Sequence, residues 1–376
     1  MDFDFSEEQN ILKKSARTFL TRELPRTRVR EIVAGEAGYS DEIWNKMAEL
    51  GWMGLIFPET YGGFDGASLD LVLILEEMGA NLCPGPFLPT VAAGLAVLAA
   101  GTEDQKAGLL PELAAGSTRA AIALTEPMTR GPASLTRIGA KADGGDWVID
   151  TVKVFVPYAH VADWLLCVCR TAEDDDPEAG LTIFRVDRET PGLTLTPLEN
   201  MANEKLYEAA FDQVRLPASA VIGEVGRGGP AIRDAFDRAA LGRAAEIVGG
   251  AQAAMDMAMQ YAGERVQFNR PIGSFPAVQK HFADMYMLIS GARQLVYQAA
   301  WKIDRGLPAR KAIALAKAHA GRTGRRVTTL GHQVFAAISF TMEHDMHLYY
   351  RQALAGDLAY GNSDYQRQVA ARELGL

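Results

Sequence analysis

The stretch RVQFNRPIGSFPAVQKHFADM, from Arg265 to Met285, predicts the architecture of the last third of this chain. Polar residues precede a Pro-Ile-Gly break, and apolar residues then recur at the spacing of a helix. We therefore expect one long helix to end near Phe268 and a second to begin near Phe275. Arg265 and Gln267, beside an exposed Phe268, are suited to hold a phosphate and to stack on a planar group. The alternative is an ordinary helical corner with polar surface residues.

Composition and charge argue against several classes of protein. The 376 residues carry a net charge of −9 with both signs interspersed, which disfavours nucleic acid or a membrane surface as a partner. The first residues, MDFDFSEEQ, are acidic and lack the apolar core of a secretory signal. Apolar runs such as residues 91–100 are too short to span a bilayer. We expect a cytoplasmic protein.

The cysteines indicate no metal site and no disulfide framework. Cys167 and Cys169 alternate along a strand-like run, so both side chains are expected on one face. Together with Cys83 they are interpreted as small core residues in a reducing compartment. His344 and His347 lie on one helical face, but the acidic residues near them do not complete a ligand set, so a structural role is favoured over a metal site.

The first third of the chain has helical periodicity. Ser6, followed by two glutamates, is a helix-start signal. Further helices are expected at residues 41–50, 69–78, 91–100 and 102–115. The glycine-rich stretch PETYGGFDGAS, residues 58–68, is expected to form an irregular loop.

From Ala120 the sequence changes to short β-type runs separated by turn signals. These runs are too close together for helical crossovers, which predicts a compact antiparallel β domain rather than a Rossmann sheet. Helical periodicity returns at Pro230 with one long helix, bent at Gly249-Gly250, and helices at residues 275–305, 309–334 and 344–357. The predicted class is α+β: an N-terminal helical domain (1–119), a middle antiparallel, barrel-like β domain (120–228) and a C-terminal helical bundle (229–376).

The sequence of the Arg265 stretch resembles the R-x-Q-F-x-x-P-I-x-x-F-x-x-V-Q segment of the acyl-CoA dehydrogenase family. In that family the Arg, Gln and Phe bind the ADP half of FAD on a neighbouring subunit. The family also has a P-E-x-Y-G-G loop and a T-E-P turn followed 28 residues later by K-x-W-I beside the flavin. Thr125 and Lys153 keep that interval. The resemblance implies the family's three-domain fold and a flavin site that includes Leu124, Thr125, Phe155 and Val156.

Two segments depart from the family pattern. After T-E-P the family's G-x-G-S-D reads Met128-Thr129-Arg130-Gly131-Pro132, where glycine backbone cannot approach a cofactor at Met128 or Arg130. Arg130 is a substitute anion ligand or a solvated loop residue. The family's Q-x-x-G-G-x-G, which approaches the ADP half of FAD, begins here at Gln333 but has Ala336 and Ala337 in place of glycines.

The family's general base is also replaced. Its glutamate occupies one of two positions, which align with Tyr360 and Ala239, and neither residue is a carboxylate. Glu246 lies two turns beyond Ala239 on the same helix side and is the nearest replacement. Its alternative role is a helix-surface partner of Arg243. Asp237 and Arg238 match positions near the thioester in relatives, or belong to a solvated face.

The resemblance therefore implies oxidation of an acyl-CoA thioester to the 2-enoyl-CoA, with FAD passing electrons to an electron-transfer flavoprotein. The lost base further suggests one half of a heteromeric enzyme whose partner supplies the base, an arrangement resembling bacterial members that act on fatty acids or steroid side chains. The alternatives are a structural or regulatory subunit that binds no FAD at its own site, and a member that reuses the fold for other flavin chemistry.

Overall fold

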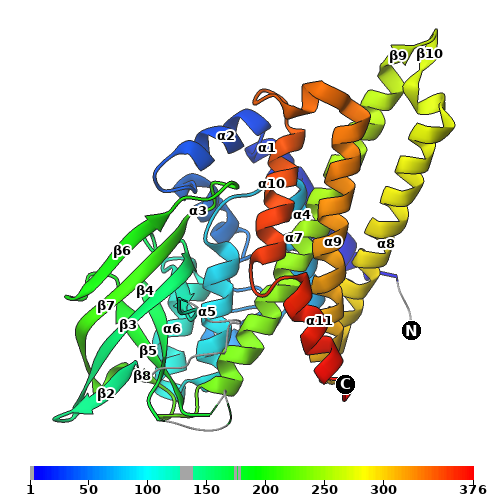
Figure 1. The fold of residues 1–376 in the computed structure, drawn as a ribbon. Coiled ribbons are helices and arrows are strands. Elements are labelled where there is room, and N and C mark those ends of the chain that lie inside the picture. Colours follow the sequence, from blue (N-terminus) through cyan, green and yellow to red (C-terminus); the bar gives the residue numbers. More distant parts are fainter. Residues whose placement is uncertain (1–3, 128–138, 173–175, 177–178) are drawn as a thin grey trace. The chain divides into compact units, whose positions relative to one another are not determined.

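The computed structural model describes residues 4–127, 139–172, 176 and 179–376. The chain divides into two compact units, each assembled from segments that are distant in sequence. One unit comprises Met1–Glu31, Ala67–Cys83 and Ala240–Leu376. The other comprises Ile32–Gly66 and Pro84–Ala239. Figure 1 shows the elements in chain order.

The first unit is built of helices. They are α1 (Glu7–Glu23), most of α2 (Arg26–Ala34), α4 (Ser68–Ala80), α7 (Gly229–Glu264) from Ala240 onward, α8 (Pro276–Asp304), α9 (Arg310–Phe335), α10 (Met346–Leu358) and α11 (Ser363–Arg372). The predicted start of α1 is confirmed: the Ser6 hydroxyl accepts the Gln9 N–H, and the Gln9 side chain accepts the Ser6 N–H. Helix α9 packs against α8, α10 and α11, so it forms the centre of this bundle.

Two close backbone approaches explain Gly79 of α4 and Gly249 of α7. A Cβ atom added to Gly249 would lie 1.8 Å from the Glu76 carbonyl oxygen, and one added to Gly79 would lie 1.9 Å from the Glu246 carbonyl oxygen. Helices α4 and α7 therefore cross at a distance that only glycine permits. Helix α7 continues without a break through Gly249-Gly250, the point at which the sequence predicted a bend.

The second unit combines helices with two four-stranded sheets. Its helices are α3 (Asp41–Glu49), α5 (Phe87–Ala100) and α6 (Glu103–Ala114), and the loop at 58–68 contains the 3-10 turn η1 (Glu59–Tyr61). One sheet has the order β1-β4-β5-β8: β1 (Ala120–Ala123), β4 (Trp164–Arg170), β5 (Leu181–Asp187) and β8 (Val221–Ile222). The other has the order β2-β3-β7-β6: β2 (Ala140–Asp143), β3 (Asp146–Pro157), β7 (Leu206–Pro217) and β6 (Leu193–Leu198).

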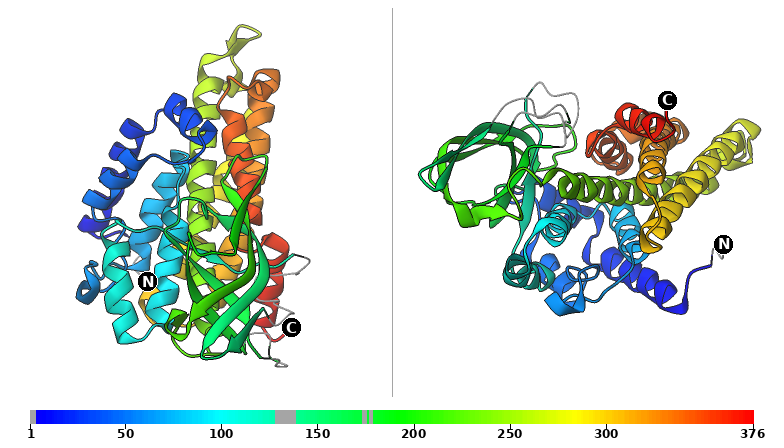
Figure 2. Two further views of the ribbon diagram at one scale, coloured as in Figure 1. Left: turned by 90° about the vertical axis from the view of Figure 1, so that its left-hand side faces the viewer. Right: turned by 90° about the horizontal axis from the view of Figure 1, so that it is seen from below.

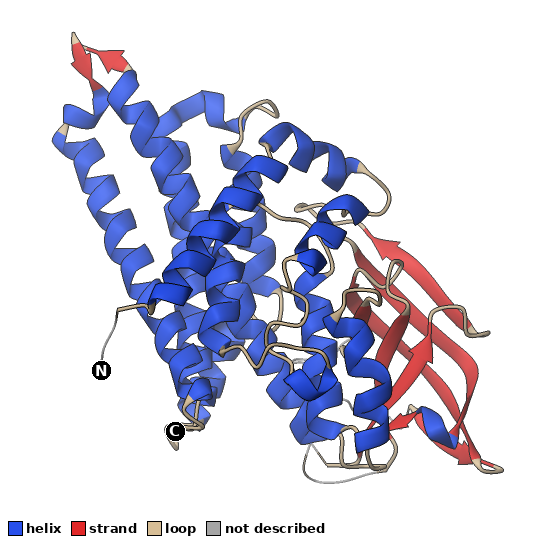
Figure 3. Ribbon diagram, turned by 180° about the vertical axis from the view of Figure 1, so that it is seen from behind, coloured by secondary structure: helices blue, strands red, loops and turns tan. Residues whose placement is uncertain are grey.

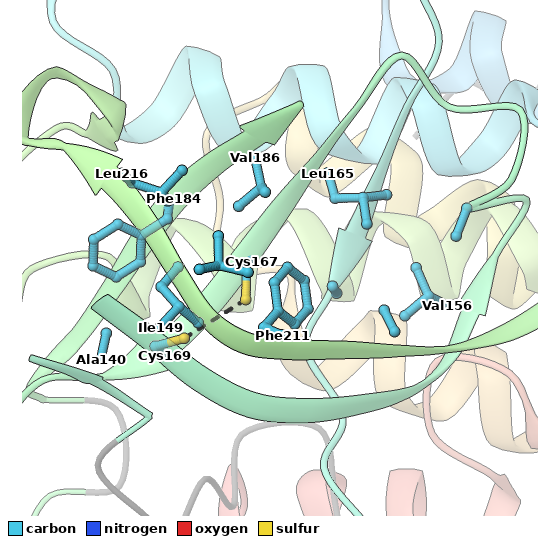
Figure 4. Packing of buried hydrophobic residues seen from close by; sticks show 14 of the residues in the cluster. Ala140, Ile149, Val156, Leu165, Cys167, Cys169, Phe184, Val186, Phe211 and Leu216 are labelled. Atoms are coloured by element: carbon cyan, nitrogen blue, oxygen red, sulfur yellow. Dashed lines mark hydrogen bonds between the residues drawn. The ribbon is translucent and has the colours of Figure 1, made fainter. Parts of the chain in front are cut away.

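The two sheets share one apolar interior, around which the strands curve in the right-hand view of Figure 2. Phe184 of one sheet and Phe211 of the other are both buried there (Figure 4). Cys167 and Cys169 lie fully buried on the same face, with their sulfur atoms 3.6 Å apart, as predicted. Burial raises the pKa of the Cys167 thiol well above its ordinary value, so Cys167 stays protonated, and both cysteines belong to the buried core.

Several predicted boundaries were wrong. Helix α7 ends at Glu264 rather than near Phe268, because residues 266–271 form the hairpin of β9 (Val266–Gln267) and β10 (Arg270–Pro271). Figure 3 shows these short strands at the end of long helices. Helix α5 begins at Phe87, four residues before the expected start. Helices α2 and α11 were not predicted, since both are short and polar.

The β domain is not wholly antiparallel, which corrects a second prediction. Strand β1 pairs with β4 in parallel, with Ala120 opposite Trp164, whereas the other named strand pairs are antiparallel. Residues between β1 and β4 pass through the second sheet, which supplies the long connection that a parallel pair requires.

Candidate functional site

The turn after β1 is joined to β3 by a buried ion pair. Lys153 of β3 is fully buried, and its Nζ lies 2.7 Å from Oε1 of Glu126. The Val154 N–H donates to the Thr125 carbonyl over 2.8 Å. Two segments that are 28 residues apart in sequence therefore meet, as the interval between Thr125 and Lys153 predicted.

A bulge in β3 turns Phe155 outward. The pairing of β3 with β7 shifts register between Lys153 and Val156, and Phe155 between them has a φ of 58°. The Phe155 side chain is 62% exposed, whereas Val156 and Leu124 are buried. Of the site residues predicted here, Leu124 and Val156 are thus buried, whereas the bulge exposes the aromatic ring of Phe155 beside Thr125.

The hairpin after α7 presents the second group of predicted residues. Arg265, Gln267 and Phe268 are all exposed, and Phe268 is 88% exposed with a φ of 50°. The Phe268 ring meets the Phe275 ring edge-on, with the two ring centroids 6.1 Å apart. The Arg270 guanidinium lies 4.2 Å from the centroid of the Phe275 ring. A guanidinium, an amide and an aromatic ring on one hairpin suit a ligand that has both an anionic and a planar part.

The end of α9 carries the third segment. Gln333 is exposed on the last turn, and the helix ends at Ala336, whose φ of 59° and ψ of −146° belong to a region that glycine alone adopts readily. The backbone therefore has a glycine conformation while the residue is alanine. The residues 128–132, where the sequence predicts the other altered segment and the anion ligand Arg130, lie outside the described residues.

Helix α7 carries the predicted base and substrate residues. Glu246 forms an ion pair with Arg243 at 3.0 Å, and only 12% of its side chain is exposed. Arg238 donates to Asp234 at 2.8 Å, and Asp237 is half-buried. The ion pair with Arg243, which the sequence suggested as the alternative role of Glu246, is therefore present. This pair is more buried than an ion pair on a helix surface.

The turn between α10 and α11 carries Tyr360. This residue has a φ of 54° and precedes Gly361, whose φ is 84°. The Tyr360 carbonyl accepts a hydrogen bond from the Gln366 side chain at 2.9 Å. A positive φ at a non-glycine residue thus occurs in each of four predicted segments, at Phe155, at Phe268 and Asn269, at Ala336 and at Tyr360. Such strain persists where surrounding contacts hold it, and it is frequent at functional sites.

Sequence reasoning missed the buried amine of Lys317. This lysine is fully buried on α9, and its Nζ donates to the carbonyl oxygens of Asp357 and Gly361. In the sequence it stands in an alanine-rich amphipathic run, where a lysine gives no signal of burial. His344 and His347 have structural contacts: His344 Nδ1 accepts the Met346 N–H, and His347 Nε2 lies 3.1 Å from the Met342 carbonyl.

Three family models together match most of the chain. The N-terminal, middle and C-terminal domains of acyl-CoA dehydrogenase match residues 6–117, 121–214 and 226–375. The chain belongs to the acyl-CoA dehydrogenase family. Within the described residues, no helix is both long enough and apolar enough to cross a membrane.

Individual relatives extend along the whole chain. The probable acyl-CoA dehydrogenase YngJ of Bacillus subtilis is 33% identical over 382 residues, with all of both chains covered. The ChsE4-ChsE5 complex from Mycobacterium tuberculosis contains a chain of similar structure, with a TM-score of 0.90, 27% identity, and 100% and 99% of the two chains covered. The FAD complex of PigA matches with a TM-score of 0.92 and 25% identity over the full length of both chains.

Proposed function

We propose that this chain takes part in the α,β-dehydrogenation of an acyl-CoA thioester with FAD, as one subunit of a heteromeric acyl-CoA dehydrogenase. The observation that carries the proposal is the Glu126–Lys153 pair. It joins the two segments that resemble the family's flavin site and leaves Phe155 exposed beside Thr125. The full-length family match supports the same reaction class.

The residues present fit a flavin dinucleotide in two places. Around Thr125, the backbone of the β1 turn and the Phe155 ring would border the flavin. On the hairpin, which the resemblance assigns to the FAD of a neighbouring subunit, Arg265 would hold a phosphate, Gln267 would donate to it, and Phe268 would stack on a planar group. When bound, FAD accepts the hydride that leaves Cβ of the thioester. Gln333, exposed at the end of α9, would line the approach to the ADP half.

Removal of the α proton requires a base, and the candidate on this chain is Glu246. Burial beside Arg243 fixes the carboxylate in one place, which a general base needs. The same ion pair also gives the carboxylate a structural role. Asp237 and Arg238 would lie near the thioester.

A second chain is proposed as the partner because Tyr360 and Ala239 occupy the family's base positions. A partner subunit with an intact carboxylate would complete the reaction. Similarity to a chain of the ChsE4-ChsE5 complex supports a heteromer, and an electron-transfer flavoprotein is the proposed electron acceptor. A location in the cytoplasm fits these partners.

The second candidate is a non-catalytic subunit that binds no FAD at its own site. Ala336 favours it, because a methyl group stands where the backbone conformation is that of glycine. A member that reuses the fold for other flavin chemistry is the remaining alternative.

Purification of the chain alone, and of the chain with its native partner, distinguishes these functions. A yellow complex whose flavin absorbance is bleached by acyl-CoA supports the dehydrogenase. A yellow, bleachable preparation of this chain alone would replace the heteromer by a homo-oligomer. A complex that carries flavin only on the partner would support the non-catalytic subunit, and bleaching by no acyl-CoA would contradict the reaction.

A further inference from the structure

A buried lysine of α9 holds the turn between α10 and α11 in place. Lys317 Nζ donates to the Asp357 carbonyl over 2.9 Å and to the Gly361 carbonyl over 3.1 Å. One acceptor belongs to the last turn of α10 and the other follows the left-handed Tyr360, so the amine bridges both sides of the turn. Burying this amine costs free energy, which its two hydrogen bonds to backbone carbonyls offset in part.

Other contacts close the turn around this amine. The Asp357 carboxylate accepts from the Ser363 N–H at 3.1 Å and from its hydroxyl at 2.5 Å. Room for that carboxylate exists because α9 has Gly321 at the contact: a Cβ atom there would lie 2.0 Å from Asp357 Oδ1. Arg325 lies 3.4 Å from the other carboxylate oxygen. The turn is thus held by α9 from one side and by α11 from the other.

We propose that Lys317 is a positioning residue: its amine locks the turn at residues 359–362, which displays Tyr360, and opening of this turn takes up a proton. Opening removes the two carbonyl acceptors and admits water to the amine. An ammonium group is far more stable in water than in a protein interior, so hydration favours its protonated form.

The charges around Lys317 support this coupling. Burial lowers its pKa from an ordinary 10.5 to about 7, Asp357 on α10 opposes that shift, and Arg243 on α7 adds to it. Arg325 and Glu246 are held in ion pairs with Asp357 and Arg243, respectively. Because the closed turn has the lowered pKa, the open form binds more protons between about pH 7 and 10.5. The closed turn therefore becomes more stable as the pH rises through that range.

Hydrogen exchange of the intact chain tests the lock without a substrate. Peptides covering residues 356–365 report on the Ala359 and Ser363 amides, which donate to Ala355 and Asp357 in the closed turn. After correction for intrinsic exchange, their opening equilibrium should fall about tenfold per pH unit between pH 7.5 and 9.5, because one proton is taken up. A protection factor that does not change with pH in the wild-type chain would overturn the proposal, and this result needs no variant.

Lys317→Met assigns the effect to this side chain. The variant should lose the pH slope, and at pH 9 it should exchange at least about tenfold faster, since two buried carbonyls lose their donor. Lys311→Met on the same helix is the matched control and should keep the slope. A retained slope in Lys317→Met would contradict the assignment to Lys317.

The consequence for catalysis rests on the proposed function. If the turn borders the substrate site, the Met variant in the native complex should change the pH profile of turnover. Exchange results alone decide whether the lock exists. A lock that is present without any effect on turnover would therefore count against the proposed location of the site and not against the lock.

Discussion

Lys153 and Glu126 form a fully enclosed contact, with Nζ 2.7 Å from Oε1, between the third strand of the β domain and the turn that follows the first. The pair fixes the register of two segments that sequence resemblance assigns to one site. A second hydrogen bond, from Thr151 to Glu126 at 3.4 Å, lies beside it. These contacts therefore hold in place the segment of β3 that carries the exposed Phe155 ring.

Breaking this pair should be strongly destabilising. In Lys153→Met a buried carboxylate loses its partner, and the free energy of unfolding should fall by about 3–5 kcal/mol. Equilibrium denaturation measures the change. Lys106→Met removes a surface partner of Glu103 and is the control, with an expected loss of at most about 1 kcal/mol. Equal losses in the two variants would show that the enclosed pair has no special role.

Ala336→Gly should stabilise the chain. Relief of an unfavourable backbone conformation is worth about 1–3 kcal/mol, and the added flexibility of unfolded glycine returns about 0.5–1 kcal/mol, so a net gain near 1 kcal/mol is expected. Ala337→Gly, in the following 3-10 turn, should destabilise instead. The midpoint of denaturation distinguishes the two variants, and a lower midpoint for Ala336→Gly would refute the backbone strain.

The variant that combines Ala336→Gly and Ala337→Gly tests the cofactor site. If the two methyl groups block the cofactor, this double variant should bind more FAD than the wild-type chain.

Arg265→Ala should weaken FAD retention in the assembled complex. A guanidinium makes charge-assisted hydrogen bonds to a pyrophosphate that alanine cannot replace. Flavin absorbance per protomer after gel filtration is the measurement. Lys280→Ala removes a different exposed cation, which lies on α8, and should leave occupancy unchanged. Full flavin occupancy in Arg265→Ala would remove this hairpin from the cofactor site.

Glu246→Gln tests the candidate base. The amide preserves shape, so fold and flavin should be retained, while flavin bleaching by acyl-CoA in stopped flow should slow by about 10²-fold to 10⁴-fold. Glu77→Gln makes the same change at a buried carboxylate paired with Arg17 and should leave the rate nearly unaltered. Near-normal bleaching in Glu246→Gln would assign the base to the partner subunit.

The segment after α9 should be sensitive to acid. His332 lies 2.8 Å from the Ser339 hydroxyl, and His344 packs against Phe335. Burial lowers the pKa of both histidines, so each is neutral in the folded chain near pH 7. Their contribution to stability is complete above the unfolded pKa of about 6.5 and is lost as the pH falls through the lower folded values.

Denaturation between pH 7.5 and 5 measures this effect. The unfolding free energy should decline by at most about 1.4 kcal/mol per pH unit for each group, and His332→Gln should flatten the decline. His281→Gln, at a half-buried position of α8, is the control. An identical acid limb in His332→Gln and wild type would show that His332 does not titrate on unfolding.

The sequence alone determined the order of helical, β and helical regions, because apolar periodicity is a local property of each segment. It also predicted that the segments of Thr125 and Lys153 meet, since the motifs around these residues and the interval between them resemble those of the family. The Arg265 stretch was identified by the same means, although its hairpin was not, because two-residue strands have no periodicity to detect.

Only the tertiary structure decided which charges are buried. Lys317 and Lys153 look like any other lysines in the sequence, yet both are fully enclosed, because segments far away in the chain supply the carbonyl and carboxylate acceptors. The left-handed backbone at Ala336 and Tyr360 was likewise invisible, since neither residue prefers it. Such conformations are imposed by packing of α9, α10 and α11 around them, and a local sequence pattern contains no record of that packing.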